Sequence, residues 1–315
     1  MIKTPICDLA GIEYPIFQGG MAWISDGKLA AAVSNGGGLG VVAAMNADAK
    51  FLREQIRIAR ELSGKPFGVN IMLMSPFAEE VAEVVAQEKV PIVTTGAGNP
   101  SKYIGAWLEA GIKVIPVVAS VALAKMMERV GASAVIAEGG ESGGHIGETT
   151  TMALVPQVCD AVSIPVIAAG GIGDGRGAAA AFMLGAQGVQ LGTRFLVAEE
   201  CSVHPNYKEK ILKASDIATA ATGRRLGHPV RSIKTAFTRA YMRAEFDSTV
   251  SDGMLEEMGA GAFRLAAVEG DADRGCFLAG QIAGMVKKEQ PAAEMISEIF
   301  AQAEIILRGA SEWIV

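Results

Sequence analysis

Cysteine and histidine are scarce in this chain, which has four cysteines and three histidines among 315 residues. The cysteines lie far apart, show no CxxC spacing and form no metal-ligand pattern with histidine. This disfavours a disulfide framework, and no set of His, Asp and Glu residues has the spacing of a metal cage. We expect reduced thiols that pack in the core at Cys7, Cys159, Cys201 and Cys276.

Long apolar runs and a secretory signal are also missing. Hydrophobic residues make up 50% of the chain, but Gly, Pro or a charged residue interrupts every apolar stretch well short of the roughly 18 residues that cross a membrane. The segment Met1–Asp8 lacks a charged start, an apolar run and a small-residue cleavage site. The net charge of -6 argues against a general nucleic-acid binder. We expect a soluble, cytoplasmic protein with no membrane or nucleic-acid partner.

Short apolar segments recur along the chain at intervals of about 20 to 30 residues, and most are followed by an amphipathic stretch. The predicted strands are Pro15–Gln18, Gly40–Ala43, Phe67–Ile71, Ile92–Thr95, Val114–Val117, Ala134–Ala137, Val166–Ala169 and Val189–Leu191. The predicted helices include Asp48–Leu62, Phe77–Glu88, Ser101–Ala110, Ser120–Val130, Thr151–Ala161 and Gly177–Leu184. Alternating strands and helices indicate a parallel α/β sheet, and eight repeats favour a (β/α)8 TIM barrel over an open Rossmann sheet.

The charge pattern changes after the eighth predicted strand. Residues 208–243 carry nine Lys or Arg against only Glu209 and Asp216, and the stretch is predicted to be helical and basic. A solvated helical face is the alternative to a binding surface. We expect a smaller, mainly helical cap at residues 201–275, inserted after strand eight, and a barrel formed by residues 1–200 and 276–315.

Two glycine-rich loops follow the last two predicted strands, within Val166–Gly175 and Val189–Phe195. Glycines leave backbone N–H groups open to a phosphate. Loops after the seventh and eighth strands of (β/α)8 barrels frequently form a phosphate site. The two loops therefore predict one shared anion site.

Residues after the strands form the catalytic face of such a barrel. Gln18, Asn70 and Gln190 can hydrogen-bond a flat ring, so FMN fits, although sugar phosphates and nucleotides use similar loops. Met21, Met72 and Met74 either line an acyl-chain channel or fill the core. Further rim positions are Gly19, Gly20, Ala43, Ala44, Met45, Asn46, Thr95, Gly96, Ala97, Gly98 and Asn99.

His145 stands out among the ionisable residues. Gly143, Gly144 and Gly147 surround it with a flexible backbone that an apolar packing site would not need. Glu138, at the end of the sixth predicted strand, either orients a hydroxyl or binds a cation, or it only accepts backbone hydrogen bonds. No Ser, His and Asp trio is evident, so hydrolysis is poorly supported.

Six motifs together resemble the superfamily of flavin-dependent nitronate monooxygenases and FabK-type enoyl-acyl-carrier-protein reductases. They are Tyr14–Met21, Phe67–Asn70, Thr94–Gly98, Gly143–His145, Ala168–Ile172 and Gln190–Arg194. The likeness spans about residues 1–200 and resumes at Ala279–Gly284. Three stretches are similar to the reductase side in particular: Asn70–Phe77, Gly144–Met152 and His204–Lys210.

This resemblance implies FMN as the bound cofactor, NADPH or NADH as the reductant, and a homodimer; it leaves a monovalent cation open. It places the FMN phosphate at Gly170, Gly171, Gly192 and Thr193. The remaining cofactor contacts that it implies are Gln18, Gly19, Gly20, Met21, Asn70, Glu138, Gly143, Gly144 and Gln190.

The implied activity is enoyl-acyl-carrier-protein reduction in bacterial type II fatty acid synthesis, with hydride transfer from N5 of FMN to a trans-2-enoyl thioester. His145 would stabilise the thioester oxyanion or deliver the α-proton. Met72 and Thr95 are candidate substrate contacts. An acidic acyl carrier protein would bind the basic cap, with Arg224, Arg225 and Arg231 as candidates.

Two other functions stay open from the sequence. A nitronate monooxygenase would use His145 to remove the proton α to a nitro group, and its reduced flavin would pass electrons to oxygen. The third interpretation is a flavin-binding module or sensor without turnover.

Overall fold

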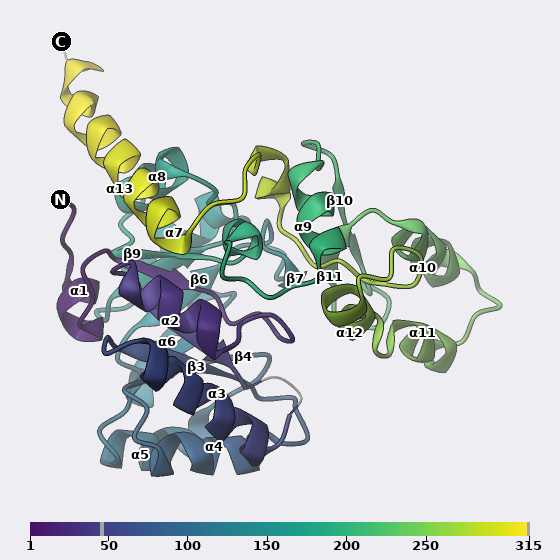
Figure 1. Ribbon diagram of the computed structural model, residues 1–315, viewed down its shortest axis with the longest axis horizontal. Helices are drawn as coiled ribbons and strands as arrows, with labels where there is room; N and C mark the ends of the chain where they lie inside the picture. The colour runs from purple at the N-terminus through teal and green to yellow at the C-terminus, as the bar shows by residue number, and fades with distance from the viewer. Residues whose placement is uncertain (45–46, 314–315) are drawn as a thin grey trace.

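The computed structural model describes residues 1–44 and 47–313, so Met45 and Asn46, two of the expected rim positions, lie outside the described residues. Its main body is a curled sheet of eight parallel strands in the order β1-β9-β8-β6-β5-β4-β3-β2 (Figure 1). The strands are β1 (Ile16–Gln18), β2 (Gly40–Ala43), β3 (Phe67–Met72), β4 (Ile92–Gly96), β5 (Lys113–Val118), β6 (Val135–Glu138), β8 (Val166–Ala169) and β9 (Gly188–Leu191). The predicted barrel and its eight strands are confirmed, with strand ends within two residues of the prediction.

Backbone hydrogen bonds close the barrel between β1 and β2, the strands at the two ends of the sheet order. The N–H of Gln18 donates to the carbonyl oxygen of Leu39 at 2.9 Å, and the N–H of Leu39 donates to that of Ile16 at 2.8 Å. Leu39 directly precedes β2, so β1 is joined to β2 as well as to β9.

Helices follow the strands and cover the outside of the barrel (Figure 1). They are α2 (Gly27–Asn35), α3 (Ala49–Leu62), α4 (Ala78–Gln87), α5 (Ser101–Glu109), α6 (Val121–Arg129), α7 (Thr151–Ala161), α8 (Gly175–Met183) and α13 (Ala292–Gly309). Several begin where a short polar side chain accepts a first-turn N–H, as Asp26 does for α2 and Asp48 for α3. Among the described residues, no helix is long and apolar enough to cross a membrane.

Side chains along each strand alternate between the barrel interior and the surrounding helices. Phe17, Ile136 and Ile167 belong to an interior cluster, and Ile6 of α1 (Pro5–Ala10) packs against it. Outward-facing residues such as Val42 pack in a larger cluster with the helices. This alternation decides which side chains near the carboxyl end of a strand face the barrel interior and which face the helices.

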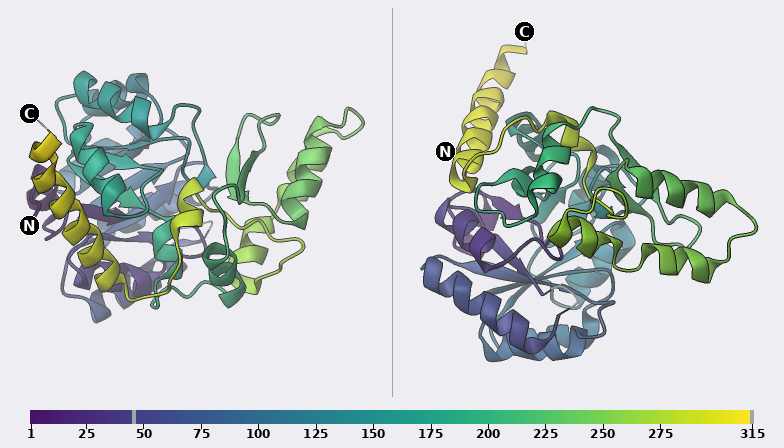
Figure 2. Two further views of the ribbon diagram at one scale, coloured as in Figure 1. Left: turned by 90° about the horizontal axis from the view of Figure 1, so that it is seen from above. Right: turned by 45° about the vertical axis from the view of Figure 1, so that its right-hand side comes forward.

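Residues 201–275, which we call the cap, project from the barrel (Figure 1, Figure 2). The elements of the cap are α9 (Pro205–Leu212), β10 (Thr219–Thr222), β11 (Val230–Ile233), α10 (Ala236–Phe246), α11 (Asp252–Gly259), α12 (Ala262–Arg264) and the π-helix η2 (Leu265–Glu269). The expectation of a helical stretch across residues 208–243 is wrong in part, because β10 and β11 form an antiparallel hairpin there. The hairpin has β-branched residues in both strands, and two glycines in the left-handed region, Gly223 and Gly227, form its turn.

The cap is joined to the barrel by a strand that the sequence did not reveal. β7 (Gly144–His145) lies in the glycine-rich loop after β6 and pairs with β11, with His145 opposite Val230. The next residue, Ile146, donates its N–H to the carbonyl oxygen of Pro229 at 3.0 Å. The loop that carries His145 is therefore part of a three-stranded sheet with the cap.

The contact between α2 and β2 requires glycine at position 40. A Cβ on Gly40 would lie 1.8 Å from the carbonyl oxygen of Ala30, a backbone atom that cannot rotate away. We expect Gly40→Ala to lower the free energy of unfolding by about 3 kcal/mol or more. Gly64→Ala is the matched control, because nothing lies within 4 Å of a Cβ there. Urea unfolding of both variants measures the difference, and equal stabilities would contradict the prediction.

Candidate active site

The carboxyl ends of the barrel strands open into a cavity of about 840 Å³, within the roughly 300–1,000 Å³ that is typical of cofactor and ligand sites. The cap contributes Gly259, Gly261, Phe263 and Arg264 to its wall. The predicted site residues that line it are Gly19, Gly20, Met21, Asn70, Met72, Glu138, Gly143, Gly144, His145, Gly170, Gly171, Gln190, Gly192 and Thr193. The candidate site thus lies where the barrel meets the cap.

Two of the site residues predicted on the barrel, Gln18 and Thr95, do not line the cavity. Gln18 directly follows the inward-facing Phe17 and so points the other way. Its Nε2 donates to Ser25 Oγ at 2.7 Å, and its Oε1 accepts the N–H of Val41 at 3.1 Å. Thr95 is also buried, and its Oγ1 has no hydrogen-bond partner among the described residues. The expected contacts of Gln18 with a flavin and of Thr95 with a substrate do not fit these positions.

Asn70 presents its amide to the cavity in a fixed orientation. Thr94 Oγ1 donates to Asn70 Oδ1 at 3.0 Å, which leaves the NH₂ group for a ligand. The loop after β1 lies directly against this side chain, because a Cβ on Gly20 would be 2.3 Å from Asn70 Cβ. Only glycine at position 20 permits this close approach.

The loops after β8 and β9 provide backbone donors for an anion. Gly170 and Gly171 have φ angles of 87° and 72°, in the left-handed region. Within residues 1–44 and 47–313, no hydrogen bond is recorded from the N–H groups of Gly170, Gly171 or Gly192. Thr193 Oγ1 accepts the N–H of Gly280 at 2.8 Å, which ties the second loop to the returning chain. Unpaired N–H groups on glycine loops fit a phosphate such as that of FMN.

Glu138 is the last residue of β6, and its carboxyl group lines the cavity. Burial raises the pKa of Glu138 to about 7, although the Ser142 hydroxyl, which donates to Oε1 at 3.1 Å, works in the opposite direction. The side chain is therefore substantially protonated at neutral pH. Among the described residues, no group of three or more His, Cys, Asp and Glu side chains could hold a metal ion.

His145 is accessible through the cavity but is partly enclosed by barrel and cap atoms. This enclosure, followed by repulsion from His228 of the cap, lowers the pKa of His145 below its ordinary value. The imidazole is therefore mainly neutral at pH 7, with one donor and one acceptor nitrogen. Such a ring can hydrogen-bond an oxygen or exchange a proton.

The sequence analysis missed several residues of the site. Glu141 accepts both the N–H and the hydroxyl of Thr151 through Oε2, each at 2.9 Å, and so caps the start of α7 beside Gly171. Its place in the glycine-rich loop after β6 was the available signal. Trp23 and Arg264 also line the cavity. Nothing local marks Arg264, because it reaches the site only through the fold of the cap.

The three candidate arginines of the cap lie outside the cavity wall. Arg224 is exposed and pairs with Glu148 at 2.6 Å. Arg225 donates to the carbonyl oxygens of Asp247 and Val250. Arg231 is half-buried and donates through Nε and Nη2 to the carbonyl oxygen of Gly140, at 3.2 and 2.9 Å. Arg225 also pairs with exposed Asp252 at 2.9 Å. Arg225 and Arg231 therefore hold loops together, and the side chain of Arg224 is the most exposed of the three.

Comparisons with known proteins agree on the family, although the relatives bear different activity names. The family model of nitronate monooxygenase matches residues 3–84 and 75–302. FabK from Thermotoga maritima has a solved structure that is 51% identical and covers 100% of both chains, with a TM-score of 0.97. A (3aS,4S,5R,7aS)-5-hydroxy-7a-methyl-1-oxo-octahydro-1H-indene-4-carboxyl-CoA dehydrogenase of Mycobacterium tuberculosis is 33% identical over 98% of each chain. A probable nitronate monooxygenase of Staphylococcus aureus is 31% identical over 97% of this chain and 99% of its own.

The raised pKa of Glu138 predicts a pH-dependent effect of Glu138→Gln. In the parent, the contribution of this carboxyl group to stability is greatest below about pH 4.5, where the group is protonated in both the folded and the unfolded state, and it is lost as the pH rises through about 7. The stability advantage of the variant over the parent should therefore grow by about 2 kcal/mol between pH 5 and pH 8. Urea unfolding at both pH values measures it, with the surface exchange Glu83→Gln as a control for net charge. An advantage that does not change with pH would refute the prediction.

Proposed function

Because the chain belongs to the nitronate monooxygenase family of oxidoreductases, we propose that it is an FMN-dependent enoyl-acyl-carrier-protein reductase of bacterial type II fatty acid synthesis. In this function it reduces trans-2-enoyl thioesters with NADPH or NADH. The observation that carries the proposal is the full-length likeness to FabK from Thermotoga maritima, at 51% identity. The identity to a probable nitronate monooxygenase over a similar span is 31%.

The cavity supports FMN as the cofactor. The N–H groups of Gly170, Gly171 and Gly192 suit its phosphate, and the amides of Asn70 and Gln190 suit the polar edge of its ring. When bound, FMN supplies the redox chemistry, taking a hydride from the nicotinamide and passing it to the enoyl group. The chain itself binds and orients both partners and limits the access of water.

His145 is the residue that we assign to the substrate. Reduction of an enoyl thioester develops negative charge on the thioester oxygen, and the α-carbon then needs a proton. A neutral imidazole at the cavity wall can donate a hydrogen bond to that oxygen or hold a proton-carrying water. The pairing of β7 with β11 holds this ring in place relative to the cap.

Delivery of the substrate by an acyl carrier protein is part of the proposal. Carrier proteins of this kind are acidic, and the cap exposes basic side chains near the site. Arg224 is the best candidate for this contact, because it is 55% exposed at its side chain and pairs only with Glu148, itself an exposed residue. Arg225 and Arg231 are weaker candidates because of their internal partners.

Nitronate monooxygenase is the second candidate function. The same neutral His145 suits removal of a proton α to a nitro group, and the family model bears the name of this activity. The two reactions differ in their electron donor and acceptor: one consumes a pyridine nucleotide without oxygen, and the other consumes oxygen without a pyridine nucleotide.

An anaerobic assay tests the proposed function. We expect the purified protein with FMN to oxidise NADPH or NADH when crotonyl-acyl-carrier protein is added under nitrogen. In the converse mixture, a nitroalkane with oxygen and no pyridine nucleotide, we expect no turnover. Activity only in the second mixture would replace the proposal by the monooxygenase, and bound flavin with activity in neither would leave a flavin-binding module.

His145→Ala tests the assigned residue. We expect kcat/KM for the crotonyl thioester to fall about 100-fold, because hydrogen bonding or proton delivery at the reacting group is lost. The flavin absorbance should be unchanged, since the phosphate loops are intact. The control is His204→Ala: His204 Nδ1 accepts the N–H of Asn206 at the start of α9 and does not line the cavity. Unchanged turnover in His145→Ala with full flavin content would remove the assignment.

A further inference from the structure

Arg264 supplies a positive charge to a cavity whose other ionisable groups include two carboxyl groups, of Glu138 and Glu141, and the mainly neutral imidazole of His145. Among the described residues that line the cavity, it is the only Arg or Lys. It lies at the end of α12, which begins after Gly261 in the left-handed region, at φ 70°. The glycine loops that suit a phosphate, after β8 and β9, belong to the barrel. Arg264 belongs to the cap and so supplies its charge from the other side of the cavity.

The guanidinium group is oriented by two contacts, and some of its N–H groups remain available to a ligand. Its Cζ lies 5.8 Å from the centroid of the Trp23 ring, within cation–π range, and Trp23 belongs to the barrel loop after β1. Nη1 pairs with Glu269 Oε1 at 2.6 Å, with both side chains about half exposed. The other guanidinium nitrogens have no recorded hydrogen bond within the described part of the chain. An exposed pair of this kind is weak and can admit a further anion.

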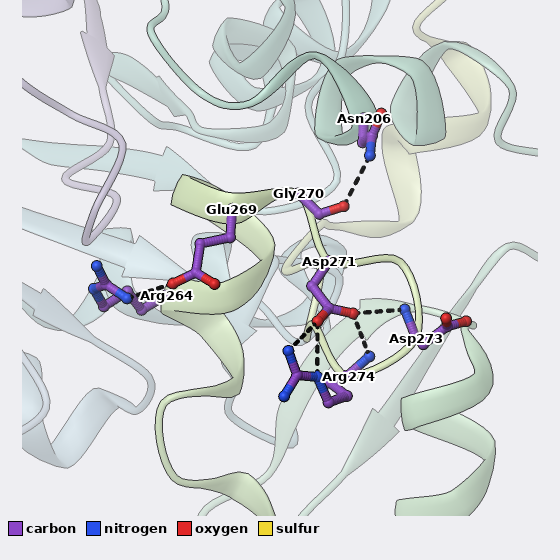
Figure 3. A network of polar contacts seen from close by, with 7 residues as sticks. All are labelled: Asn206, Arg264, Glu269, Gly270, Asp271, Asp273 and Arg274. Carbon is purple, nitrogen blue, oxygen red and sulfur yellow. Dashed lines mark hydrogen bonds and ion pairs between the residues drawn. The ribbon is translucent and has the colours of Figure 1, made fainter.

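The segment that carries this pair is tightly fixed (Figure 3). Asn206 Nδ2 donates to the carbonyl oxygen of Gly270 at 2.9 Å. Asp271 accepts the N–H groups of Asp273 and Arg274, at 3.0 and 2.9 Å, and also the Nε of Arg274. Asp271 in turn donates its N–H to the carbonyl oxygen of Leu265 at 3.1 Å. The backbone next to Arg264 is therefore held by this turn, which reduces the entropy lost when the side chain binds a ligand.

We propose that Arg264 binds a phosphate ester group of a cosubstrate that enters the cavity beside the cap. This inference rests on the proposed function, in which both cosubstrates carry such groups: the pyrophosphate of a nicotinamide dinucleotide and the phosphate of a phosphopantetheine thioester. Arginine matches phosphate with two parallel N–H donors. Trp23 and Phe263 provide the apolar surface beside it for the remainder of the ligand.

Two substrates that differ only in a phosphate group measure the contribution of that group to binding. Crotonyl-phosphopantetheine and crotonyl-pantetheine differ only in that group, and each is assayed with the parent and with Arg264→Gln. We expect the variant to raise KM by about tenfold for the substrate whose phosphate it binds, with little change in kcat. If the bound phosphate belongs to the acyl carrier arm, only crotonyl-phosphopantetheine is affected; if it belongs to the dinucleotide, the KM for NADPH or NADH rises with either thioester.

Arg239→Gln is the matched control, because Arg239 lies in the cap on α10, is exposed and does not line the cavity. It should retain the parent KM values. Equal KM values in Arg264→Gln and the parent for all these substrates would overturn the proposal, as would the same rise for crotonyl-pantetheine and crotonyl-phosphopantetheine at an unchanged KM for the dinucleotide.

A binding measurement separates this proposal from the proposed function. Trp23 lies under the Arg264 guanidinium, so phosphopantetheine or NADP⁺ should change the tryptophan fluorescence of the parent at concentrations where pantetheine does not. Arg264→Gln should lose this response and Arg239→Gln should keep it. If the fluorescence response depends on Arg264 but the protein does not reduce an enoyl thioester, the proposed function is wrong and the phosphate site stands. If the protein reduces the enoyl thioester but Arg264→Gln shows the same fluorescence response as the parent, the phosphate site is wrong and the proposed function stands.

Discussion

The short antiparallel pairing of β7 with β11 is the constraint on which the site depends. Two residue pairs, His145 with Val230 and Gly144 with Arg231, join a barrel loop to the cap hairpin. The bond from Ile146 to Pro229 and the two bonds from Arg231 to Gly140 extend the same junction. Each such bond contributes only about 1 kcal/mol. Together they fix the histidine loop and the cap as one wall, so the cavity has a defined shape.

Burial in this cavity acts on its acid and its base in opposite directions. Removing water penalises the charged form of each group, so the pKa of Glu138 rises and that of His145 falls. Near neutral pH the cavity therefore holds a carboxyl group that is about half protonated and a mainly neutral imidazole. Both are able to donate a hydrogen bond, which suits a reaction in which negative charge develops on a carbonyl oxygen.

In the proposed function, backbone and side chains share the recognition of ligands. The barrel loops offer N–H groups at Gly170, Gly171 and Gly192, where side chains are absent and a phosphate can approach the main chain. The cap offers a charged side chain, Arg264, at the end of α12, and the N–H of Asp271 in the turn that follows bonds to the neighbouring Leu265. Glycine at position 20 serves a different purpose, because it lets the first loop pack against Asn70. The site is thus selective through its shape and through a small number of polar groups.

The barrel, its strand ends and the two glycine loops could be predicted from the order of residues, because they follow from local periodicity and from the conformations that glycine permits. The same local signals placed His145, Asn70 and Glu138 near one another, since the carboxyl ends of parallel strands meet at one face. They did not separate Gln190, which faces the cavity, from Gln18, which faces the helices; that depends on the phase of each strand within the closed barrel. The two-residue strand β7 exists only because β11, more than 80 residues later, comes to lie beside it. Arg264 likewise reaches the cavity through the packing of the cap on the barrel, a long-range contact that no local pattern encodes.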